Sequence, residues 1–581
     1  MRYLIIILLL VASPVWAATY YVDYGSTSCS SPSDTDYDPA TRTCGSGSST
    51  VYDTVGGVDA VVGSGDTVWV RECDETFAND DAFSPNYAGG SSENDRITYE
   101  CYTGETCIFR GDPSGDNFIY YPGSYYSFID FEFRDITSGR AIGALFSYAT
   151  FKEIVVDGVT STTGSQIVLG NATHDPTDIV FDSCVFDDIF EGGEVEDGDL
   201  IEIDGARETL IINSTFGDVT HSNFITLYDE DNLNHKTYIF NCTFQNTWRY
   251  DIDFYTNSTD QRQGVFIDNC VFKDQGSVAN PVTGSQGPGG IFNIGGFGWM
   301  TIIRSELYDS YAGLVISQPG TTPADTTKLY LAHNTFYNFT TTEPEDSEYY
   351  EGMFIWVDMW TADINLTNSR IINNIFSETD ETTHMWEFLF DAASNNPSGN
   401  VFSHNLFYDS DGTNPQRIYD FHKGWGLQSV TYCQTNDSTQ WTGSDVLNDN
   451  PDMTDPGSGD FTLTYPSPAR DAGDFLATIK SKDGDTLELN AGEEYFFFAK
   501  ESFGIEYSGV SSHTIYAQDG ASSVLTAVNY GSATIEVSTG EGSLFEVGDT
   551  LTMVNFYGSA PDIGANEYED TAVTGKGITI E

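Results

Sequence analysis

The sequence predicts an all-β protein built as a right-handed, three-faced parallel β-helix of roughly ten or more coils. The first observation behind this prediction is a near-repeat: "LIINSTF" (210–216), "YIFNCTF" (238–244) and "FIDNCVF" (266–272) end 28 residues apart. The second is the repeat length, because a period in the twenties or thirties of residues is typical of a solenoid. The third is composition. Short alternating runs of Ile, Val, Thr, Phe and Tyr are separated by Gly, Asn, Asp and Ser, as expected for short strands joined by turns.

Other repeat architectures fit this pattern less well. The chain has no long amphipathic helical stretch and no dense leucine consensus, and a β-propeller needs about 40 or more residues per blade. The residue that closes each repeat can be followed along the chain, and intervals of 35 and 40 residues are explained by loop insertions. These closing residues are Phe133, Val159, Phe186, Phe216, Phe244, Phe272, Leu307, Phe336, Phe376 and Phe407.

Stacking of equivalent strands about 4.8 Å apart explains why the motif recurs. Phe216, Phe244 and Phe272 are expected to form one inward column of aromatic rings. A second inward column is expected two residues earlier, at Cys184, Ser214, Cys242 and Cys270. We interpret these thiols as small buried side chains, because thiols in a line do not converge on one metal ion.

The chain divides into five predicted segments. Residues 1–17 have a charged start, an apolar stretch and a small-residue end, which is typical of a signal peptide and predicts a secreted or cell-surface protein. Residues 18–110 are expected to form an N-terminal cap with the first coils, and residues 111–474 the β-helix. Residues 475–559 alternate around Gly-Asp turns and predict a small inserted β-module, followed by a terminal segment at 560–581.

Charge and cysteine content limit the partners and the compartment. The chain has 88 acidic and 23 basic residues, a net charge of −65, which repels nucleic acid and anionic membranes. Such a surface attracts cations, calcium above all. The alternative explanation for the acidic surface is adaptation to salty or acidic surroundings, where the carboxylates serve solubility alone. Export permits disulfides, and the local pairs expected are Cys29–Cys44 and Cys101–Cys107, with Cys73 and Cys433 left as partners or free thiols.

Both ends of the chain carry a family resemblance. The early segments "YYVDYGST" (20–27) and "VGSGDTVWVRE" (62–72) resemble the opening of secreted bacterial right-handed parallel β-helix proteins. The late segments "NPDMTDPGSGDFTLTYPSPARDAG" (450–473) and "APDIGANEY" (560–568) resemble the closing coil of the same family. The resemblance is to the polysaccharide-lyase-like superfamily that includes pectate lyases, chondroitinase B and alginate lyases. It implies the fold; because the superfamily also holds glycoside hydrolases, epimerases and adhesins, it leaves the activity open.

Candidate functional residues gather on three successive predicted strands, "LIEIDG" (200–205), "FITLYDED" (224–231) and "DIDFYT" (251–256). If the aliphatic residues point inward, Glu202, Thr226 and Asp253 share one outward column, and Asp204, Tyr228 and Tyr255 share the next. Glu202 and Asp253 are then about 10 Å apart, at two strand spacings. A shift of one residue in register would exchange the inward and outward sets.

Two mechanisms fit such a face. In a lyase, Ca²⁺ held by carboxylates would neutralise a uronate while a cationic side chain acts as base or charge stabiliser. In an inverting hydrolase, two carboxyl groups act as acid and base around a water molecule. The expected metal ligands are Glu202, Asp204, Asp229 and Asp231; the expected catalytic residues are Lys236, Arg249, Asp251 and Asp253; the expected substrate-binding residues are Tyr228, Trp248, Tyr255, His235 and Arg262.

The leading functional hypothesis is therefore calcium-assisted β-elimination of an acidic extracellular polysaccharide by a monomeric protein that neither binds nucleic acid nor inserts into a membrane. An inverting glycoside hydrolase and a non-catalytic adhesin are the alternatives. The carboxylates could also serve only to solvate one face of an acidic protein.

Overall fold

The structure is a computed structural model of the chain. It describes residues 17–566 except for a set of short internal stretches. These stretches are 27, 31–32, 77–82, 84–88, 91, 112–116, 121–122, 138–139, 145–146, 161–164, 171–175, 191–198, 205–206, 221–222, 230–235, 248–249, 257–263, 276–289, 295–297, 311, 317–327, 340–352, 358–365, 379–387, 391–398, 410–417, 421–424, 448 and 557.

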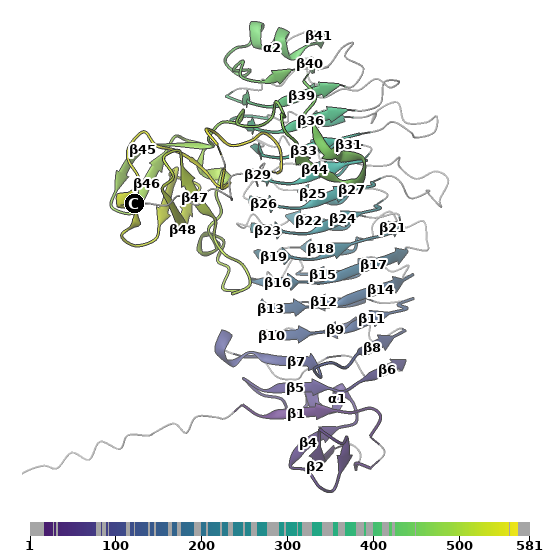
Figure 1. The fold of residues 1–581 in the computed structure, drawn as a ribbon. Coiled ribbons are helices and arrows are strands. Elements are labelled where there is room, and N and C mark those ends of the chain that lie inside the picture. Colours follow the sequence, from purple (N-terminus) through teal and green to yellow (C-terminus); the bar gives the residue numbers. More distant parts are fainter. Residues whose placement is uncertain are drawn as a thin grey trace, which may run out of the picture.

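Three long sheets run side by side along the molecule, and the strands stack as an elongated column (Figure 1). The largest, sheet A, has 16 strands and is parallel except at its N-terminal end. In spatial order these are β3 (Thr43–Cys44), β2 (Ser33–Asp38), β4 (Ser49–Tyr52), β1 (Thr19–Val22), β5 (Thr67–Val70), β7 (Ile97–Cys101), β10 (Ser124–Ile129), β13 (Ser147–Lys152), β16 (Ile179–Asp182), β19 (Glu208–Ile212), β23 (Lys236–Phe240), β26 (Gly264–Asp268), β29 (Trp299–Ile303), β32 (Leu329–Ala332), β35 (Arg370–Ile372) and β38 (Val401–Ser403).

Sheets B and C complete each coil. Sheet B contains β6 (Cys73–Thr76), β8 (Cys107–Arg110), β11 (Glu132–Arg134), β14 (Val155–Val159), β17 (Val185–Phe190), β20 (Thr215–Phe216), β21 (Val219–Thr220), β24 (Thr243–Gln245), β27 (Val271–Lys273), β30 (Glu306–Tyr308), β33 (Thr335–Tyr337), β36 (Ile375–Glu378), β39 (Leu406–Asp409) and β42 (Val446–Leu447). Sheet C contains β9 (Asn117–Tyr120), β12 (Arg140–Ala144), β15 (Ile167–Leu169), β18 (Ile201–Asp204), β22 (Ile225–Asp229), β25 (Ile252–Thr256), β28 (Phe292–Ile294), β31 (Ala312–Ile316), β34 (Met353–Val357), β37 (Phe388–Phe390), β40 (Ile418–Asp420) and β41 (Trp425–Gln428).

Each coil visits sheet A, then B, then C, and the next coil stacks on it in parallel. For example, β19, β20 and β22 pair with β23, β24 and β25 of the following coil. This is the three-faced parallel β-helix that the repeat predicts, so the predicted fold class is confirmed. Phe216, Phe244 and Phe272 are in register, with ring centroids 4.5 and 4.7 Å apart, so the inward aromatic column is also confirmed.

The small-residue column is buried as predicted. Cys184, Ser214, Cys242 and Cys270 are at most 1% exposed, and the thiols are free. Each thiol lies within hydrogen-bonding distance of main-chain carbonyls, as Cys242 Sγ does of Ile211 O at 3.5 Å. In later coils the same position is occupied by Ser305, Asn334, Asn374 and Asn405.

The asparagine that precedes this column closes the corner between sheets A and B. Asn213, Asn241 and Asn269 have φ values of 53°, 54° and 54°, a left-handed conformation that asparagine tolerates better than most residues. Their side chains form a chain of amide hydrogen bonds, Asn241 Nδ2 to Asn213 Oδ1 at 2.8 Å and Asn269 Nδ2 to Asn241 Oδ1 at 3.2 Å. The asparagine of the repeat therefore serves both the left-handed conformation of the corner and the hydrogen bonds between successive coils.

A closed barrel lies beside sheet A (Figure 1). Its strands are β45 (Ala477–Asp483), β46 (Thr486–Leu489), β47 (Thr514–Ala517), β48 (Ser522–Asn529), β49 (Thr534–Val537) and β50 (Thr550–Thr552), with η3 (Glu494–Phe496), η4 (Lys500–Phe503) and η5 (Glu541–Leu544) between them. We call residues 475–559 the module. Its core joins a stripe of outward apolar residues on sheet A, namely Val180, Leu210, Ile212, Tyr238, Phe266, Ile303, Tyr330, Ala332 and Ile372.

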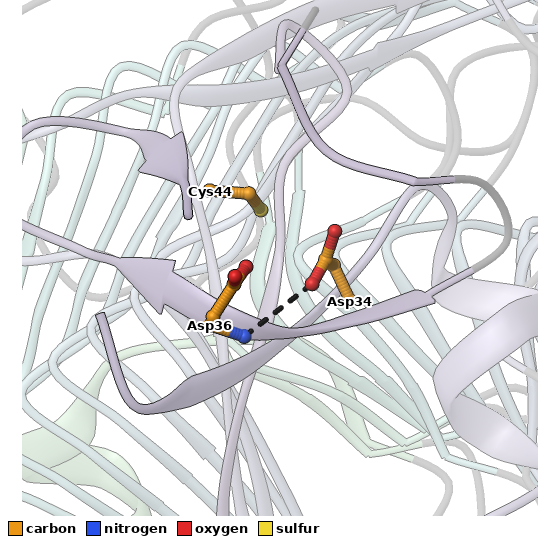
Figure 2. Close-up of side chains that lie close together, drawn as sticks. All are labelled: Asp34, Asp36 and Cys44. Carbon is orange, nitrogen blue, oxygen red and sulfur yellow. Dashed lines mark hydrogen bonds between the residues drawn. The ribbon is translucent and has the colours of Figure 1, made fainter. Parts of the chain in front are cut away.

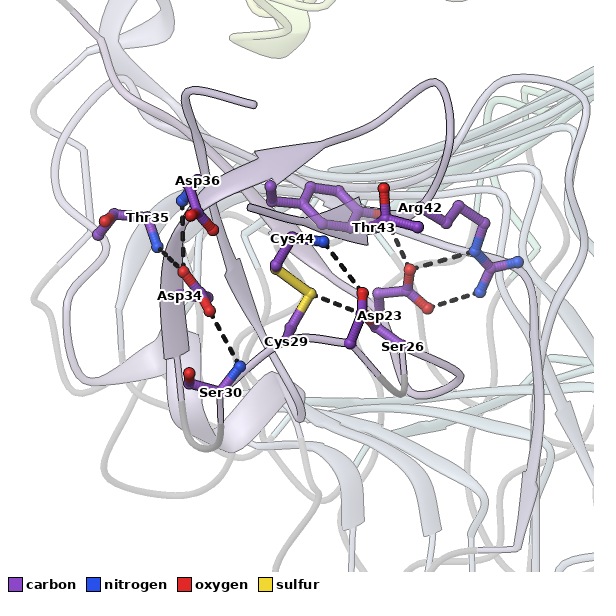
Figure 3. Close-up of a disulfide and its surroundings, with 12 residues drawn as sticks. Asp23, Ser26, Cys29, Ser30, Asp34, Thr35, Asp36, Arg42, Thr43 and Cys44 are labelled. Atoms are coloured by element: carbon purple, nitrogen blue, oxygen red, sulfur yellow. Dashed lines mark hydrogen bonds and ion pairs between the residues drawn. A yellow bond between two sulfur atoms is a disulfide. The ribbon is translucent and has the colours of Figure 1, made fainter. Parts of the chain in front are cut away.

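The remaining elements lie at the two ends of the column and on one of its sides. Near the N-terminal end are α1 (Val55–Asp59), η1 (Glu93–Asp95) and the disulfides Cys29–Cys44 (Figure 3) and Cys101–Cys107, both as predicted. Towards the other end is α2 (Val430–Asn436). The hairpin of β43 (Met453–Asp455) and β44 (Asp460–Leu463), with η2 (Pro456–Ser458), packs on sheet B, where Phe461 contacts Tyr308 and Tyr337. Cys73 and Cys433 are buried and take part in neither disulfide. Within the described residues, no helix has the length and apolar character that a membrane span requires.

Candidate functional site

The predicted register of the candidate face is confirmed on sheet C. Glu202 of β18 pairs with Thr226 of β22, which pairs with Asp253 of β25. The column continues to Asn293 of β28. The intervening aliphatic residues are buried in the coil interior, and we call the outward set, Glu202, Thr226, Asp253 and Asn293, the polar column.

Three polar side chains support the polar column, and each lies at the corner before one strand of sheet C. They are Ser165 before β15, Asp199 before β18 and Asn223 before β22. Ser165 Oγ donates to Glu202 Oε2 at 2.6 Å and accepts from the Asp199 main-chain N–H at 3.2 Å. Asn223 Nδ2 lies 3.0 Å from Asp199 Oδ1 and 3.1 Å from Thr226 Oγ1. The result is a buried polar network in which side chains of successive coils hydrogen-bond to one another and fix the orientation of the polar column.

Asp253 is the most tightly held carboxylate of the network. Asn293 Nδ2 donates to its Oδ1 at 2.8 Å, and Asn223 Nδ2 donates to its Oδ2 at 3.2 Å. The side chain is only 6% exposed. Two amide donors stabilise the ionised form of a carboxylate and fix its orientation.

Asp251 does not lie with the polar column. Asp251 directly precedes Ile252, just as Phe224 directly precedes Ile225, and these two isoleucines are in register. Asp251 therefore takes the corner position that Phe224 has in the preceding coil, and it is fully buried. Thr247 Oγ1 donates to Asp251 Oδ1 at 2.6 Å, while Oδ2 has no hydrogen-bond partner. Burial raises the pKa of Asp251 to about 8, with the Thr247 hydrogen bond opposing the shift. The structure thus places Asp251 inside the coil, away from the outward face where the alternation placed it.

Lys236 begins β23 on sheet A, beneath the module, and is not a neighbour of the polar column in the register. Its ammonium donates to the main-chain carbonyl of Ser502 and lies 5.6 Å from the ring centroid of Phe503. Burial lowers the pKa of Lys236, and the nearby charge of Glu208 partly offsets this. Because this side chain is engaged by the module, the structure does not bring it to the candidate face.

The other predicted residues fall into two groups. Asp204, Tyr228 and Tyr255 are in register with one another, in the column two residues after the polar column, as expected. Asp229 follows Tyr228 at the end of β22. The side chains of these four residues are not among those that the structure describes. Asp231, His235, Trp248, Arg249 and Arg262 all lie outside the described residues.

Two groups of side chains have oxygen or sulfur atoms close enough to share one metal ion among the described residues, and neither includes the polar column. One is Asp34, Asp36 and Cys44 (Figure 2). Cys44 is bonded to Cys29 and is no thiolate, and Asp34 already accepts hydrogen bonds from the main-chain N–H groups of Ser30, Thr35 and Asp36 (Figure 3). This group is therefore a turn structure. The other group, Glu93, Asp178 and Glu506, joins sheet A to the module.

The supporting residues Ser165, Asn223 and Asn293 were not foreseen from the sequence. Asn223 stands in "HSNFITLYDED", one residue before an inward aromatic. Aligning the corner residues of successive repeats, and not only their strands, would have placed Asn223 in one column with Asp199.

Comparisons with known proteins bear on the fold. No protein-family model matches the chain, and no curated protein sequence matches it. Among solved structures, a pectate lyase is 12% identical, with 95% of this chain and 96% of that chain covered and a TM-score of 0.41. The complex of XylC with xylose is 9% identical, covering 92% and 99%, with a TM-score of 0.45. The PfbA surface adhesin of Streptococcus pneumoniae is 11% identical, covering 65% and 88%, with a TM-score of 0.33.

The predicted resemblance holds for the fold. The three stacked parallel sheets of this chain are themselves those of a right-handed parallel β-helix. At 9–12% identity and TM-scores of 0.33–0.45, the three structures carry no argument about activity, which has to be argued from the residues of the polar column.

Proposed function

We propose that this protein cleaves an extracellular polysaccharide on the outer face of sheet C, with Glu202 and Asp253 as the reacting carboxylates. The observation that carries the proposal is the register Glu202–Thr226–Asp253, which sets two carboxylates on alternate strands of one face. Two strand spacings amount to about 9.6 Å.

This strand separation lies at the upper limit for acid–base hydrolysis with inversion. In inverting glycosidases the two carboxyl groups are about 6.5–9.5 Å apart, which leaves room for the attacking water. Asp253, held by amide donors from Asn223 and Asn293, is suited to be the base that takes a proton from this water. Glu202 is more exposed than Asp253 and is suited to donate a proton to the leaving glycosidic oxygen.

The shape of the face supports a polymer as substrate. The strand positions of sheet C continue in register on either side of the polar column, from β9 to β40. The neighbouring column carries two tyrosines, Tyr228 and Tyr255, and sugar rings stack on this type of side chain in other proteins. A linear chain of sugars can follow such an extended surface over several coils.

Calcium-assisted β-elimination is the second candidate. It is supported by two further carboxylate residues, Asp204 and Asp229, in the adjacent strands β18 and β22, because Ca²⁺ prefers oxygen ligands. Ca²⁺ bound there would neutralise a substrate carboxylate and would offset the repulsion that a protein of charge −65 exerts on a polyuronate. The base for this reaction would have to come from a residue other than Lys236.

One assay separates the two reactions. Pectin, alginate, glycosaminoglycans and neutral glycans are each incubated with the protein, with Ca²⁺ or with chelator, and both reducing ends and ultraviolet-absorbing unsaturated ends are measured. Hydrolysis gives reducing ends without the absorbing product, and elimination gives both. Binding without either product would overturn the proposal in favour of an adhesin.

Variants test the site itself. Glu202→Gln and Asp253→Asn are each expected to lower turnover by about 10²–10⁴-fold, the usual contribution of a general acid or base. Asp188→Asn is the matched control, because it removes one carboxylate at an exposed left-handed corner of sheet B where asparagine is equally tolerated. Equal activity in all four proteins would exclude the polar column as the catalytic site.

A further inference from the structure

A second carboxylate group lies between the β-helix and the module. Asp178 immediately precedes β16 on sheet A, Glu93 begins η1, and Glu506 follows η4 in the module. One carboxylate oxygen from each of the three lies within 4.8 Å of the other two. Oxygen ligands sit about 2.3–2.6 Å from a bound Ca²⁺, so atoms on opposite sides of one ion are about 5 Å apart. The three oxygens are therefore within the span of a single ion.

Asp178 provides an independent sign that a ligand belongs here. Its side chain is 4% exposed, and in the described part of the chain it accepts no hydrogen bond. A buried carboxylate without donors is costly, and such groups are paired or bind metal in folded proteins.

The neighbouring cation does not fill this role. Arg96 uses its guanidinium on the Glu93 carboxylate and on the main-chain carbonyls of Tyr126 and Tyr148. Its strand position is three coils before that of Asp178, in the column Arg96, Tyr125, Tyr148, Asp178, Glu208 and Lys236. Lys236 at the other end of this column is bound to Ser502. Both described cations of the column are thus committed to other acceptors.

The module brings Glu506 to this place through fixed contacts on either side. Tyr507 Oη donates to Asp182 Oδ2 of β16 at 2.5 Å, and Ile505 is buried in the shared core. Gly504 adopts a φ of +73°, and a Cβ there would meet Glu208 Cγ at 3.4 Å. The segment crosses sheet A at the level of Asp178 because both neighbours of Glu506 are anchored.

We propose that Glu93, Asp178 and Glu506 form a divalent-cation site, suited to Ca²⁺, that fastens the module to the β-helix. The three carboxylates supply hard oxygen ligands from three separate parts of the chain, and water completes the six to eight ligands that Ca²⁺ takes. The site differs in place and purpose from the polar column: it is on sheet A and holds two structural units together. Sites of this kind in extracellular modules bind Ca²⁺ with dissociation constants of about 10⁻⁴–10⁻³ M.

Terbium luminescence tests the site on the full chain. Tb³⁺ accepts excitation from nearby tyrosines, and Tyr507 adjoins Glu506 in the chain while Tyr125 and Tyr148 precede Asp178 in its column. Tyrosine-sensitised emission that saturates in 150 mM salt and is displaced by millimolar Ca²⁺ is the expected result. Wild-type protein without such emission would overturn the proposal.

Three variants assign the emission to these residues. Asp178→Asn keeps the shape and suits the φ of +55° at this position, and Glu506→Gln removes the ligand from the module. Each is expected to weaken Tb³⁺ binding at least tenfold and to abolish the rise in melting temperature that 5 mM Ca²⁺ gives the wild type. Glu536→Gln, on an exposed position of β49 in the same module, removes one charge and is the control that retains both effects. Unchanged binding in Asp178→Asn and Glu506→Gln would overturn the assignment.

Glu202→Gln separates this site from the proposed catalytic face. If the cation site exists, Glu202→Gln retains the sensitised emission whether or not it retains turnover. Loss of emission in Glu202→Gln together with unchanged emission in Asp178→Asn would place the cation on sheet C instead.

Discussion

Two regions of the β-helix each bury an aspartate completely, and the two carboxyl groups behave in opposite ways. Asp251 lies in the apolar corner before β25, where only Thr247 donates to it, and burial raises its pKa to about 8. Asp268 ends β26 on the covered face of sheet A. Arg304 Nε and Nη2 donate to its two oxygens at 2.8 and 2.6 Å, and His513 Nε2 lies 2.9 Å from Oδ2.

The partners decide the outcome. Burial alone would raise the pKa of Asp268, but the charge of Arg304 and the hydrogen bond from His513 outweigh it and hold the pKa at about 2. His513 belongs to the module and accepts the Phe498 main-chain N–H at Nδ1, so its Nε2 carries the proton that points to Asp268. Burial lowers the pKa of His513 and keeps the ring neutral. Asp268 is thus an ionised residue that links the β-helix to the module through Arg304 and His513, whereas Asp251 is a neutral buried side chain. We call the group Asp268, Arg304 and His513 the charged joint.

The largest expected effect comes from breaking the charged joint. Asp268→Ala leaves the guanidinium of Arg304 buried without its counter-charge, and removal of one partner from a buried ion pair costs about 3–5 kcal/mol. We expect a loss near the upper end, about 5 kcal/mol, because His513 loses its acceptor as well. Denaturant unfolding at pH 7 measures this loss, and limited proteolysis reports release of the module.

The control for this prediction is Asp483→Ala, at the exposed end of β45, which removes one carboxylate of the module without a buried partner. It is expected to change the unfolding free energy by less than about 0.5 kcal/mol. Similar losses in Asp268→Ala and Asp483→Ala would contradict the role given to the buried joint.

The second effect is a pH dependence from the corner aspartate. The folded-state pKa of Asp251, about 8, is above that of an unfolded aspartate, so the folded protein binds more protons between these values. Stability from this group is complete below pH 4 and is lost as pH rises towards 8. The slope of 1.36 kcal/mol per pH unit gives about 4 kcal/mol between pH 5 and pH 8.

Asp251→Asn isolates this contribution. The difference in unfolding free energy between wild type and variant is expected to shift by about 4 kcal/mol in favour of the variant from pH 5 to pH 8. Asp268→Asn provides the contrast, because a pKa lowered to about 2 affects stability only below about pH 4. A constant difference between wild type and Asp251→Asn across this range would show that the corner carboxyl is ionised throughout.

These two acids also show what sequence reasoning can and cannot reach. The fold, the aromatic column, the thiol column and the register Glu202–Thr226–Asp253 follow from residues that repeat at coil spacing. Asp251 is predicted as a catalytic residue because it directly precedes the strand of Asp253, but it lies in a corner, where the chain turns and its side chain is buried.

Lys236 was misplaced for a different reason. Its partner Ser502 is 266 residues away in the chain and belongs to the module. The outward apolar residues of sheet A, such as Leu210, Tyr238 and Phe266, did carry a signal that something covers that face. They did not reveal which side chains the cover would engage, because that depends on how the module docks and not on the repeat.

The smallest expected effect is on stability and compares two parts of the inward column of small residues. One part contains Cys242 and the other contains Asn374, and the two parts differ in their hydrogen bonds. Asn374 accepts the main-chain and side-chain N–H groups of Asn334 at 3.0 and 2.9 Å, and its own amide donates to Leu331 O at 3.1 Å. Asn374→Ala leaves these buried groups without partners and is expected to lower the unfolding free energy by about 3 kcal/mol. Cys242→Ser is expected to change it by less than about 1 kcal/mol, because Ser214 and Ser305 already occupy the same column and donate to the main chain at 2.8 and 2.9 Å. Equal losses from the two substitutions, measured by denaturant unfolding, would contradict the prediction that the amide hydrogen bonds of Asn374 make this part of the column the more sensitive one.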